Sequence, residues 1–322
     1  MLVVGCVLQC IEPALTIAAS LSCSKSCWLP FIPGVENSKD EARKLQQQII
    51  EDGFGGRNWE YGTVKGDLIG VIAAFNAWAT FSNREKERKK FASRNALDHN
   101  ALTEMQGLRT QFKDSLRASG LLIEMSRKNE EDSVSNNMNA SLVTCCLVAG
   151  LYPNIATLMR PSRKHKIFAA RLITKNGDSC KASSSSFQQE RLKRAREEGK
   201  DAYAVYHSKH LFIGSTDESQ RTIQQIFLSE INFVSRFAII LFGGQIEVRK
   251  NFLLVDEWLK FKVADEEESK SASQINAVLI QELRRELDNT LLIRIAGELG
   301  HGKYERVIGT VRRLLSEEME AI

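Results

Sequence analysis

The sequence predicts an α+β protein with an N-terminal helical bundle, a small β-module and C-terminal helices. Apolar residues recur at helical spacing through residues 1–125, which is typical of amphipathic helices that pack on one another. Residues 142–264 carry short β-branched and aromatic runs separated by turn residues, which is typical of a small antiparallel barrel or sandwich. Residues 265–322 return to helical spacing, and the polar stretch 126–141 is the expected linker.

The composition is that of a globular protein and indicates no particular partner. A chain of 322 residues is long enough for two domains, each with its own core. Apolar residues make up 43% and charged residues 26% of the sequence, as in ordinary soluble domains. The net charge of +4 is too small to indicate a polyanionic partner, so local clusters of charge must decide that question.

The apolar stretch Leu2–Leu21 could be mistaken for a signal peptide or a membrane span. No lysine or arginine precedes Lys25, and Glu12-Pro13 interrupts the apolar run, so a buried helix pair is the favoured interpretation. The seven cysteines are an odd number, which argues against a secreted disulfide framework. We therefore expect a reduced, intracellular protein that does not contact a membrane, in a compartment that the sequence does not specify.

Four cysteines have a spacing that could hold a tetrahedral zinc ion, because Cys6-x3-Cys10 is followed by Cys23-x3-Cys27. Cys6 and Cys10 would lie on one face of an apolar helical segment, where a free cysteine is usually a small core residue. Core cysteines are therefore favoured, zinc is the alternative, and we predict no metal.

The helices of the first part begin at polar residues. Ser38 precedes a helix that runs to about Glu51, and Asp67 is the expected N-cap of the next helix. Asp98 begins a further helix, which carries apolar side chains on one face and ends near Gly120. Three or four amphipathic helices of this kind predict a bundle.

Five strands are predicted in the β-module. Asn176-Gly177-Asp178 is a tight-turn signal between two of them, and Glu190–Lys200 is expected to be a charged helical excursion. After a tail helix that includes Leu287, a final helix is predicted over about Lys303–Glu318. The predicted strands cover Asn154–Met159, Ile167–Thr174, Tyr203–His207, Ile223–Leu228 and Ala238–Leu241.

No set of residues has the pattern of a catalytic site. His207 and His210 have the spacing of a ligand pair, but on a strand they would lie on opposite faces. Gly297-Glu-Leu-Gly-His-Gly-Lys303 has the spacing of a phosphate loop, yet Tyr304 stands where a Ser or Thr would bind magnesium. A helix rather than a strand precedes it, so we interpret this stretch as a connection between helices and predict no catalytic residues.

Two basic clusters are candidates for nucleic-acid binding. The first follows the first predicted strand, where OB-type barrels bind nucleic acid, and it contains no acidic residue; the alternative is a solvated face. The second, Arg191–Arg196, is partly offset by neighbouring glutamates and is expected to be solvated. Lys181 and the serine run Ser183–Ser186 add donors suited to phosphates. The predicted RNA-binding residues are Arg160, Arg163, Lys164, Lys166, Arg171, Lys181, Ser183, Ser184 and Ser185.

Ordered motifs along the chain resemble the C-terminal accessory region of the DEAH/RHA family of RNA helicases. They are Glu12-Pro-Ala-Leu-Thr-Ile-Ala-Ala19, Phe75-Asn-Ala-Trp78, Leu108-Arg-Thr-Gln-Phe112, Ala149-Gly-Leu-Tyr-Pro-Asn-Ile155, Ser235–Gly244 and Val255-Asp-Glu-Trp-Leu-Lys-Phe261. The resemblance spans residues 3 to about 290. It implies a helicase-associated, ratchet-like bundle over 1–125, with the end of a degenerate winged helix at 1–10. It also implies a five-stranded OB-type β-barrel over 142–264, with Ser235–Gly244 as a late strand.

The sequence lacks the motifs with which the family binds and hydrolyses ATP. It contains no Gly-x-Gly-Lys-Thr/Ser, no Asp-Glu-Ala/Ile-His and no Gln-Arg-x-Gly-Arg motif. The family's His-Pro-Ser-Ser loop corresponds to Lys181-Ala-Ser-Ser184, so the hydroxyls remain while the imidazole does not. We therefore expect a truncated or fragmentary chain that cannot hydrolyse ATP alone. ATP and magnesium are cofactors of the full-length family, and none is expected for this chain.

The resemblance implies two functions. In the first, the chain is an RNA-binding accessory region that guides single-stranded RNA along the helicase channel. In the second, the OB-type barrel docks helicase activator proteins that carry Gly-rich segments, and the chain is a protein-interaction module.

Overall fold

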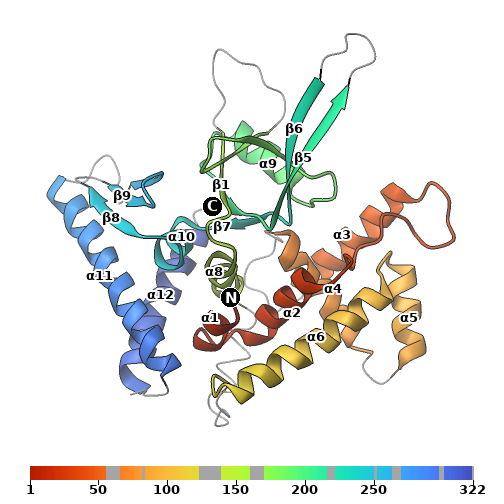
Figure 1. Cartoon of the computed structure of the whole chain (residues 1–322), viewed down its shortest axis with the longest axis horizontal. Helices are drawn as coiled ribbons and strands as arrows, with labels where there is room; N and C mark the ends of the chain where they lie inside the picture. Colours follow the sequence, from red (N-terminus) through yellow and green to blue (C-terminus); the bar gives the residue numbers. More distant parts are fainter. Residues whose placement is uncertain are drawn as a thin grey trace.

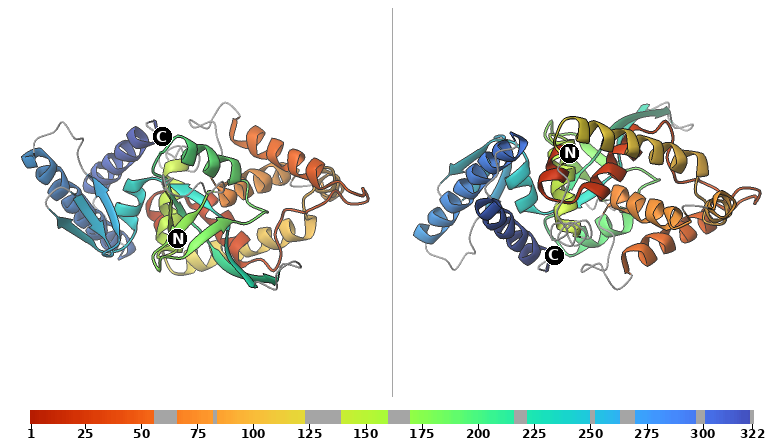
Figure 2. Two further views of the ribbon diagram at one scale, coloured as in Figure 1. Left: turned by 90° about the horizontal axis from the view of Figure 1, so that it is seen from above. Right: turned by 90° about the horizontal axis from the view of Figure 1, so that it is seen from below.

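The computed structural model describes residues 1–55, 66–81, 84–122, 139–159, 170–215, 222–249, 252–262, 270–296 and 301–320. The predicted α+β class is confirmed, because a helical region precedes two sheets and two long helices follow them (Figure 1). Figure 2 shows the last two helices, in blue, toward one end of the molecule and the helices of about residues 39–94, in orange, toward the other. Among the helices that the structure describes, none combines the length and apolar character needed to span a lipid bilayer.

The N-terminal part is a bundle of helices, as predicted. Trp78, Leu102 and Met105 are among the residues that fill its core. The side chain of Asp98 accepts hydrogen bonds from the amides of Asn100 and Ala101, so the predicted cap of the longest helix here is confirmed. The helices are α1 (Leu2–Val7), α2 (Ile11–Ser22), α3 (Lys39–Gly55), α4 (Asp67–Ala79), α5 (Glu85–Arg94) and α6 (His99–Ala118).

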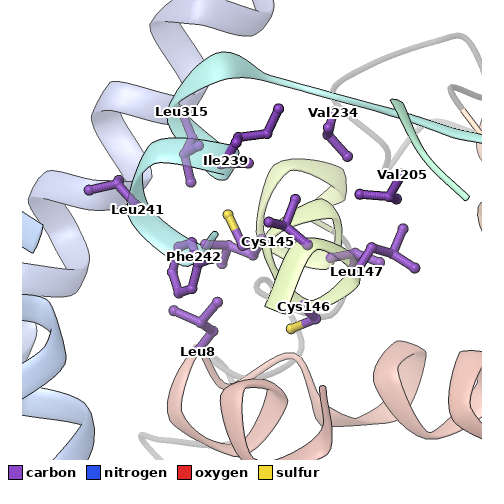
Figure 3. Packing of buried hydrophobic residues seen from close by; sticks show 14 of the residues in the cluster. Leu8, Cys145, Cys146, Leu147, Val205, Val234, Ile239, Leu241, Phe242 and Leu315 are labelled. Carbon is purple, nitrogen blue, oxygen red and sulfur yellow. The ribbon is translucent and has the colours of Figure 1, made fainter. Parts of the chain in front are cut away.

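The β-module begins with a buried helix, α8 (Ala140–Leu151). Asn139 caps this helix by accepting hydrogen bonds from the amides of Ser141 and Leu142. Figure 3 shows α8 surrounded by apolar side chains from the residue that follows α1, from two strands of the larger sheet, from the helix of residues 236–242 and from the last helix. The labelled residues are Leu8, Cys145, Cys146, Leu147, Val205, Val234, Ile239, Leu241, Phe242 and Leu315. The helix α8 therefore packs against the N-terminal bundle, the larger sheet and the C-terminal helices at once.

The larger sheet has seven strands in the order β5-β6-β3-β2-β1-β4-β7. All described pairs are antiparallel except β3 and β6, which are parallel. Only Tyr206 and His207 separate β4 from β5, although these two strands lie at or near opposite ends of the order. The strands are β1 (Ile155–Leu158), β2 (Leu172–Thr174), β3 (Ser179–Ala182), β4 (Tyr203–Val205), β5 (Ser208–Ser215), β6 (Thr222–Ser229) and β7 (Asn232–Val234).

Three predicted strands are confirmed, because β1, β4 and β6 lie where the sequence places them. Of the described part of Ile167–Thr174, only the last three residues form a strand, β2. The long strand β5 was not predicted, and with β6 it forms a hairpin that extends away from the sheet (Figure 1). The charged excursion is the helix α9 (Gln189–Glu197), as predicted.

The predicted strand Ala238–Leu241 is wrong, because these residues lie in the helix α10 (Arg236–Phe242). Ser235 caps this helix by accepting a hydrogen bond from the amide of Ala238. A short apolar run buried on every side has no polar face that distinguishes a helix from a strand. The same reason applies to Leu142–Val148, which we expected to begin the β-module and which lies in α8.

The C-terminal part combines a second sheet with two helices. Its three antiparallel strands have the order β10-β9-β8. The predicted tail and final helices are confirmed. The elements are β8 (Ile246–Arg249), β9 (Phe252–Val255), β10 (Leu259–Lys262), α11 (Lys270–Ile295) and α12 (His301–Glu320).

Candidate nucleic-acid interface

Two predicted cations, Arg171 and Lys181, stand at the end of the β2–β3 ladder where its register, continued by one step, sets them opposite each other. The register pairs Leu172 with Cys180, so one further step in the same register places Arg171 opposite Lys181. Side chains that are directly opposite each other in an antiparallel pair share one face of the sheet. Neither cation forms an ion pair with any residue that the structure describes. Two adjacent positive charges without an acidic partner are suited to an anionic ligand.

The serine run forms a compact turn directly after β3. The hydroxyls of Ser183 and Ser185 are 2.9 Å apart, and the amide of Ser185 also donates to the Ser183 hydroxyl. The amide of Ser186 donates to the Ser183 carbonyl, which closes the turn. Ser184 and Ser185 are exposed, whereas Ser186 is buried. The turn thus presents hydroxyl groups to solvent two residues beyond Lys181.

The turn is held from both sides by other parts of the chain. On the sheet side, the amide of Ser183 donates to the carbonyl of Leu228 on β6 at 2.8 Å. On the bundle side, Arg43 of α3 donates to the carbonyls of Ser185 and Ser186, at 2.7 and 2.5 Å. The guanidinium of Arg43 also lies over the ring of Phe187, 3.6 Å from its centroid.

Asp67, at the beginning of α4, connects the same turn to the sheet. Its two carboxylate oxygens accept hydrogen bonds from the amides of Phe187 and Ile231, at 2.8 and 2.9 Å. Burial raises the pKa of Asp67 to about 6, although hydrogen bonds from Ser186, Phe187 and Ile231 and the nearby Arg43 lower it in part. The prediction that Asp67 caps α4 is wrong, because Gly66 is the N-cap and the carboxylate is used for these tertiary contacts.

Close contact between α4 and the sheet depends on a glycine. The side-chain oxygen of Asn232 on β7 accepts a hydrogen bond from the amide of Leu68 at 2.9 Å. A Cβ atom on Gly66 would lie 2.1 Å from that oxygen, so no larger residue fits without displacing Asn232. The bundle and the sheet are therefore joined by specific polar contacts as well as by apolar packing.

Of the nine predicted RNA-binding residues, five fall within the described part of the chain and are brought together here: Arg171, Lys181, Ser183, Ser184 and Ser185. Arg160, Arg163, Lys164 and Lys166 lie outside the described residues. Arg43 and Asp67 were missed by the sequence prediction. Their role depends on residues more than a hundred positions away, and no local pattern indicates such a contact.

His99 and two of the candidate zinc ligands, Cys10 and Cys27, have structural roles. His99 accepts a hydrogen bond from the Trp78 indole and its other ring nitrogen lies 2.9 Å from Glu85. Cys10 lies in the core, with its sulfur 3.4 Å from that of Cys146, and burial raises the pKa of Cys27 to about 12. No disulfide joins any of the seven cysteines. Within the described ranges, no group of three or more His, Cys, Asp or Glu side chains could hold a metal ion.

Comparison with known proteins agrees with this architecture. Residues 1–102 match the family described as helicase associated domain (HA2), ratchet-like. The chain is 27% identical over 301 residues to ATP-dependent DNA/RNA helicase DHX36 of Bos taurus, which covers 92% of this chain and 25% of the relative. The chain is homologous to DEAH-box helicases. The chain is equally similar to ATP-dependent DNA/RNA helicase DHX36 of Homo sapiens, at 27% identity over 92% of this chain and 26% of the relative.

A plant relative extends the comparison. The chain is 25% identical to DExH-box ATP-dependent RNA helicase DExH1 of Arabidopsis thaliana, over 90% of this chain and 24% of the relative. The chain thus spans about a quarter of the length of these curated relatives. The resemblance to the accessory region of DEAH/RHA-family helicases, read from the motifs, is confirmed.

Proposed function

We propose that this chain is an RNA-binding accessory region of a DEAH/RHA-type ATP-dependent RNA helicase and that it guides single-stranded RNA. The observation that carries the proposal is the β2–β3 register, whose continuation by one step sets Arg171 opposite Lys181, beside the exposed Ser184 and Ser185. Cations attract the phosphate backbone, and hydroxyls donate hydrogen bonds to its oxygens. Contacts of this kind read the backbone rather than the bases, which suits a surface along which RNA moves.

The strand order supports an OB-type barrel formed by β1–β6, residues 155–229, which is shorter than the predicted 142–264. In this proposal β1, β2 and β3 form the first three strands, the nearly continuous run β4–β5 forms the fourth and β6 the fifth. The run β4–β5 pairs with β1 at one end and with β6 at the other, and β6 pairs in parallel with β3. OB-type barrels bind nucleic acid through the loop between strands one and two. Residues 160–169, with four of the predicted cations, occupy that connection.

Titration of a fluorescein-labelled oligouridine at several salt concentrations tests the proposal. For single strands, the slope of log affinity against log salt is about 0.7 for each neutralised phosphate. The double variant Arg171→Ala/Lys181→Ala is therefore expected to bind more weakly and to lose up to about 1.4 from the slope. Replacing Arg160, Arg163, Lys164 and Lys166 by alanine is expected to have a larger effect.

The matched control removes two positive charges from the other basic cluster, in the variant Arg194→Ala/Arg196→Ala on α9. It is expected to leave the slope nearly unchanged, because those charges lie on a helix that we interpret as solvated. Absence of binding at low salt, or equal effects of the two double variants, would refute the proposal.

We further propose that this chain does not hydrolyse ATP, and that ATP and magnesium act in the remaining part of full-length relatives. The support is the absence of the ATPase motifs from the sequence. Magnesium-dependent ATP turnover by the purified chain, above that of a heat-denatured control, would contradict this.

A second candidate function is a protein-interaction module that docks helicase activators with Gly-rich segments. The observation in its favour is three consecutive exposed apolar residues on β5, Leu211, Phe212 and Ile213, which are 57%, 58% and 61% exposed. Leu211→Ser/Ile213→Ser should abolish binding of such an activator peptide and leave RNA affinity unchanged. The opposite pattern, with RNA affinity lost and peptide binding kept, would exclude this function for the hairpin.

A further inference from the structure

Arg43 of α3 and Asp67 of α4 connect the serine turn after β3 to the helical bundle, and Arg43 contacts the turn's backbone carbonyls. Arg43 of α3 donates from one terminal nitrogen to the carbonyl of Ser185 and from the other to the carbonyl of Ser186. A planar guanidinium can hold two acceptors in a fixed mutual orientation, which a lysine cannot do. The orientation of two successive peptide groups in the turn is therefore set by a side chain from another part of the fold.

We propose that Arg43 is a positioning residue for RNA: it holds the Ser183–Ser186 turn in the shape that presents its hydroxyls to phosphate, without contacting RNA itself. This inference rests on the proposed function above, because it concerns the same turn.

The contacts of Arg43 are directed inward. Its two terminal nitrogens bind carbonyls, and its flat face lies against the ring of Phe187. That ring also meets the indole of Trp28, with 5.2 Å between the ring centroids. Burial lowers the pKa of Arg43, and the negative charge of Asp67 opposes that change. A guanidinium whose terminal nitrogens and flat face are already engaged in this way stabilises the turn and is poorly placed to bind phosphate.

The turn has a defined shape only when both of its sides are held. Asp67 holds the amide of Phe187 from α4, and Leu228 on β6 holds the amide of Ser183. Between these two contacts, Arg43 donates hydrogen bonds to the carbonyls of Ser185 and Ser186, which follow the exposed Ser184. Loss of its donors would leave the Ser185 and Ser186 carbonyls without these partners and allow the peptide groups to rotate. The hydroxyls would then no longer be fixed relative to Lys181.

The variant Arg43→Met tests the proposal, because methionine keeps an apolar side chain on Phe187 but has no donors. RNA affinity is expected to fall about tenfold, the effect of losing one or two phosphate hydrogen bonds. The slope of log affinity against log salt should remain that of the native chain, because hydroxyls displace no counterions. Amide hydrogen exchange at residues 183–188 should become faster, while exchange in α6 stays unchanged.

The matched control is Arg191→Met. Arg191 on α9 also lies over an aromatic ring, 5.2 Å from the centroid of Phe233, and burial likewise lowers its pKa. This variant removes the same charge and a similar ring contact, and RNA affinity should stay within about twofold of the native value. Equal losses in the two variants would show a general effect of charge and overturn the inference.

Two further results separate failure of this inference from failure of the proposed function. If Arg171→Ala/Lys181→Ala leaves RNA affinity unchanged, the proposed function itself fails. If that variant weakens binding while Arg43→Met does not, only the role of Arg43 is refuted. A slope reduced by about 0.7 in Arg43→Met would mean that the guanidinium contacts phosphate directly, which also overturns positioning.

A second substitution keeps the test valid if Arg43→Met does not fold. Arg43→Lys retains the positive charge near Asp67 but can place only one compact donor group. It is expected to fold and to bind RNA more weakly than the native chain. Native affinity with native hydrogen exchange in Arg43→Lys would refute the requirement for a two-donor side chain.

Discussion

Replacing Asp67 by asparagine is predicted to change how the free energy of unfolding depends on pH. Asp67 is only 8% exposed, and burial raises its pKa from an ordinary value of 3.8 to about 6. The folded protein therefore takes up a proton at a pH where the same carboxyl in the unfolded chain is ionised. Because the folded-state pKa is the higher one, the stabilising contribution is complete below about pH 4 and is lost as pH rises through 6.

The size of the effect follows from the shift in pKa. A shift of about two units corresponds to about 3 kcal/mol between the fully protonated and fully ionised limits. About 2 kcal/mol of this should be lost between about pH 4.5 and about pH 7.5, because the unfolded carboxyl is already largely ionised at the lower value. Asp67→Asn lacks this contribution. The free energy of unfolding of the native chain minus that of the variant should therefore fall by about 2 kcal/mol between about pH 4.5 and about pH 7.5.

Urea denaturation followed by tryptophan fluorescence, repeated across this pH range, measures the difference. Asp178→Asn is the control, because a hydrogen bond from Lys209 lowers the pKa of Asp178 and its titration lies below the range. That variant should show the native dependence on pH. If the native and Asp67→Asn curves stay parallel, or if the native chain gains relative stability as pH rises, burial does not control this carboxyl.

Further substitutions test the fold by the same denaturation measurement. Leu147→Ala in α8, where the side chain is 0% exposed, should lower the free energy of unfolding by about 2–5 kcal/mol. Leu211→Ala on the exposed hairpin should change it by less than about 0.5 kcal/mol. Similar losses in the two variants would contradict the central position of α8. Tyr152→Phe removes a hydroxyl that donates to Asp256 and should cost about 1–3 kcal/mol, and a neutral result would show that this bond contributes nothing. Asp98→Ala should cost about 1 kcal/mol through loss of the α6 cap, and an unchanged midpoint would refute that role.

Amphipathic helices and turns were predictable because their signals lie within a few residues. The cap at Asp98, the charged helix α9 and the final helix all follow from local patterns of polarity. The strands β1, β4 and β6 were also predictable, because turn residues bound short β-branched or aromatic runs. The ordered motifs added the relationship to helicases, which no periodicity alone indicates.

Buried apolar segments were not predictable in the same way. Cys145 and Leu147 in α8 and Ile239 in α10 lie in runs with no polar face, and such runs are compatible with either a helix or a central strand. The surrounding side chains decide between the two, since α8 is enclosed by both the bundle and the C-terminal helices (Figure 3). That enclosure is a property of the whole fold.

The sequence by itself determined the α+β class, the order of helical and β parts, and the cationic and hydroxyl residues of the candidate site. Only the tertiary structure decided how the candidate site is assembled. Arg43 reaches carbonyls that lie 142 and 143 positions further along the chain, and Asp67 bridges Phe187 and Ile231. Local patterns report periodicity, capping and turn geometry over a few residues. The contacts that shape the serine turn depend instead on how α3, α4 and the sheet pack together.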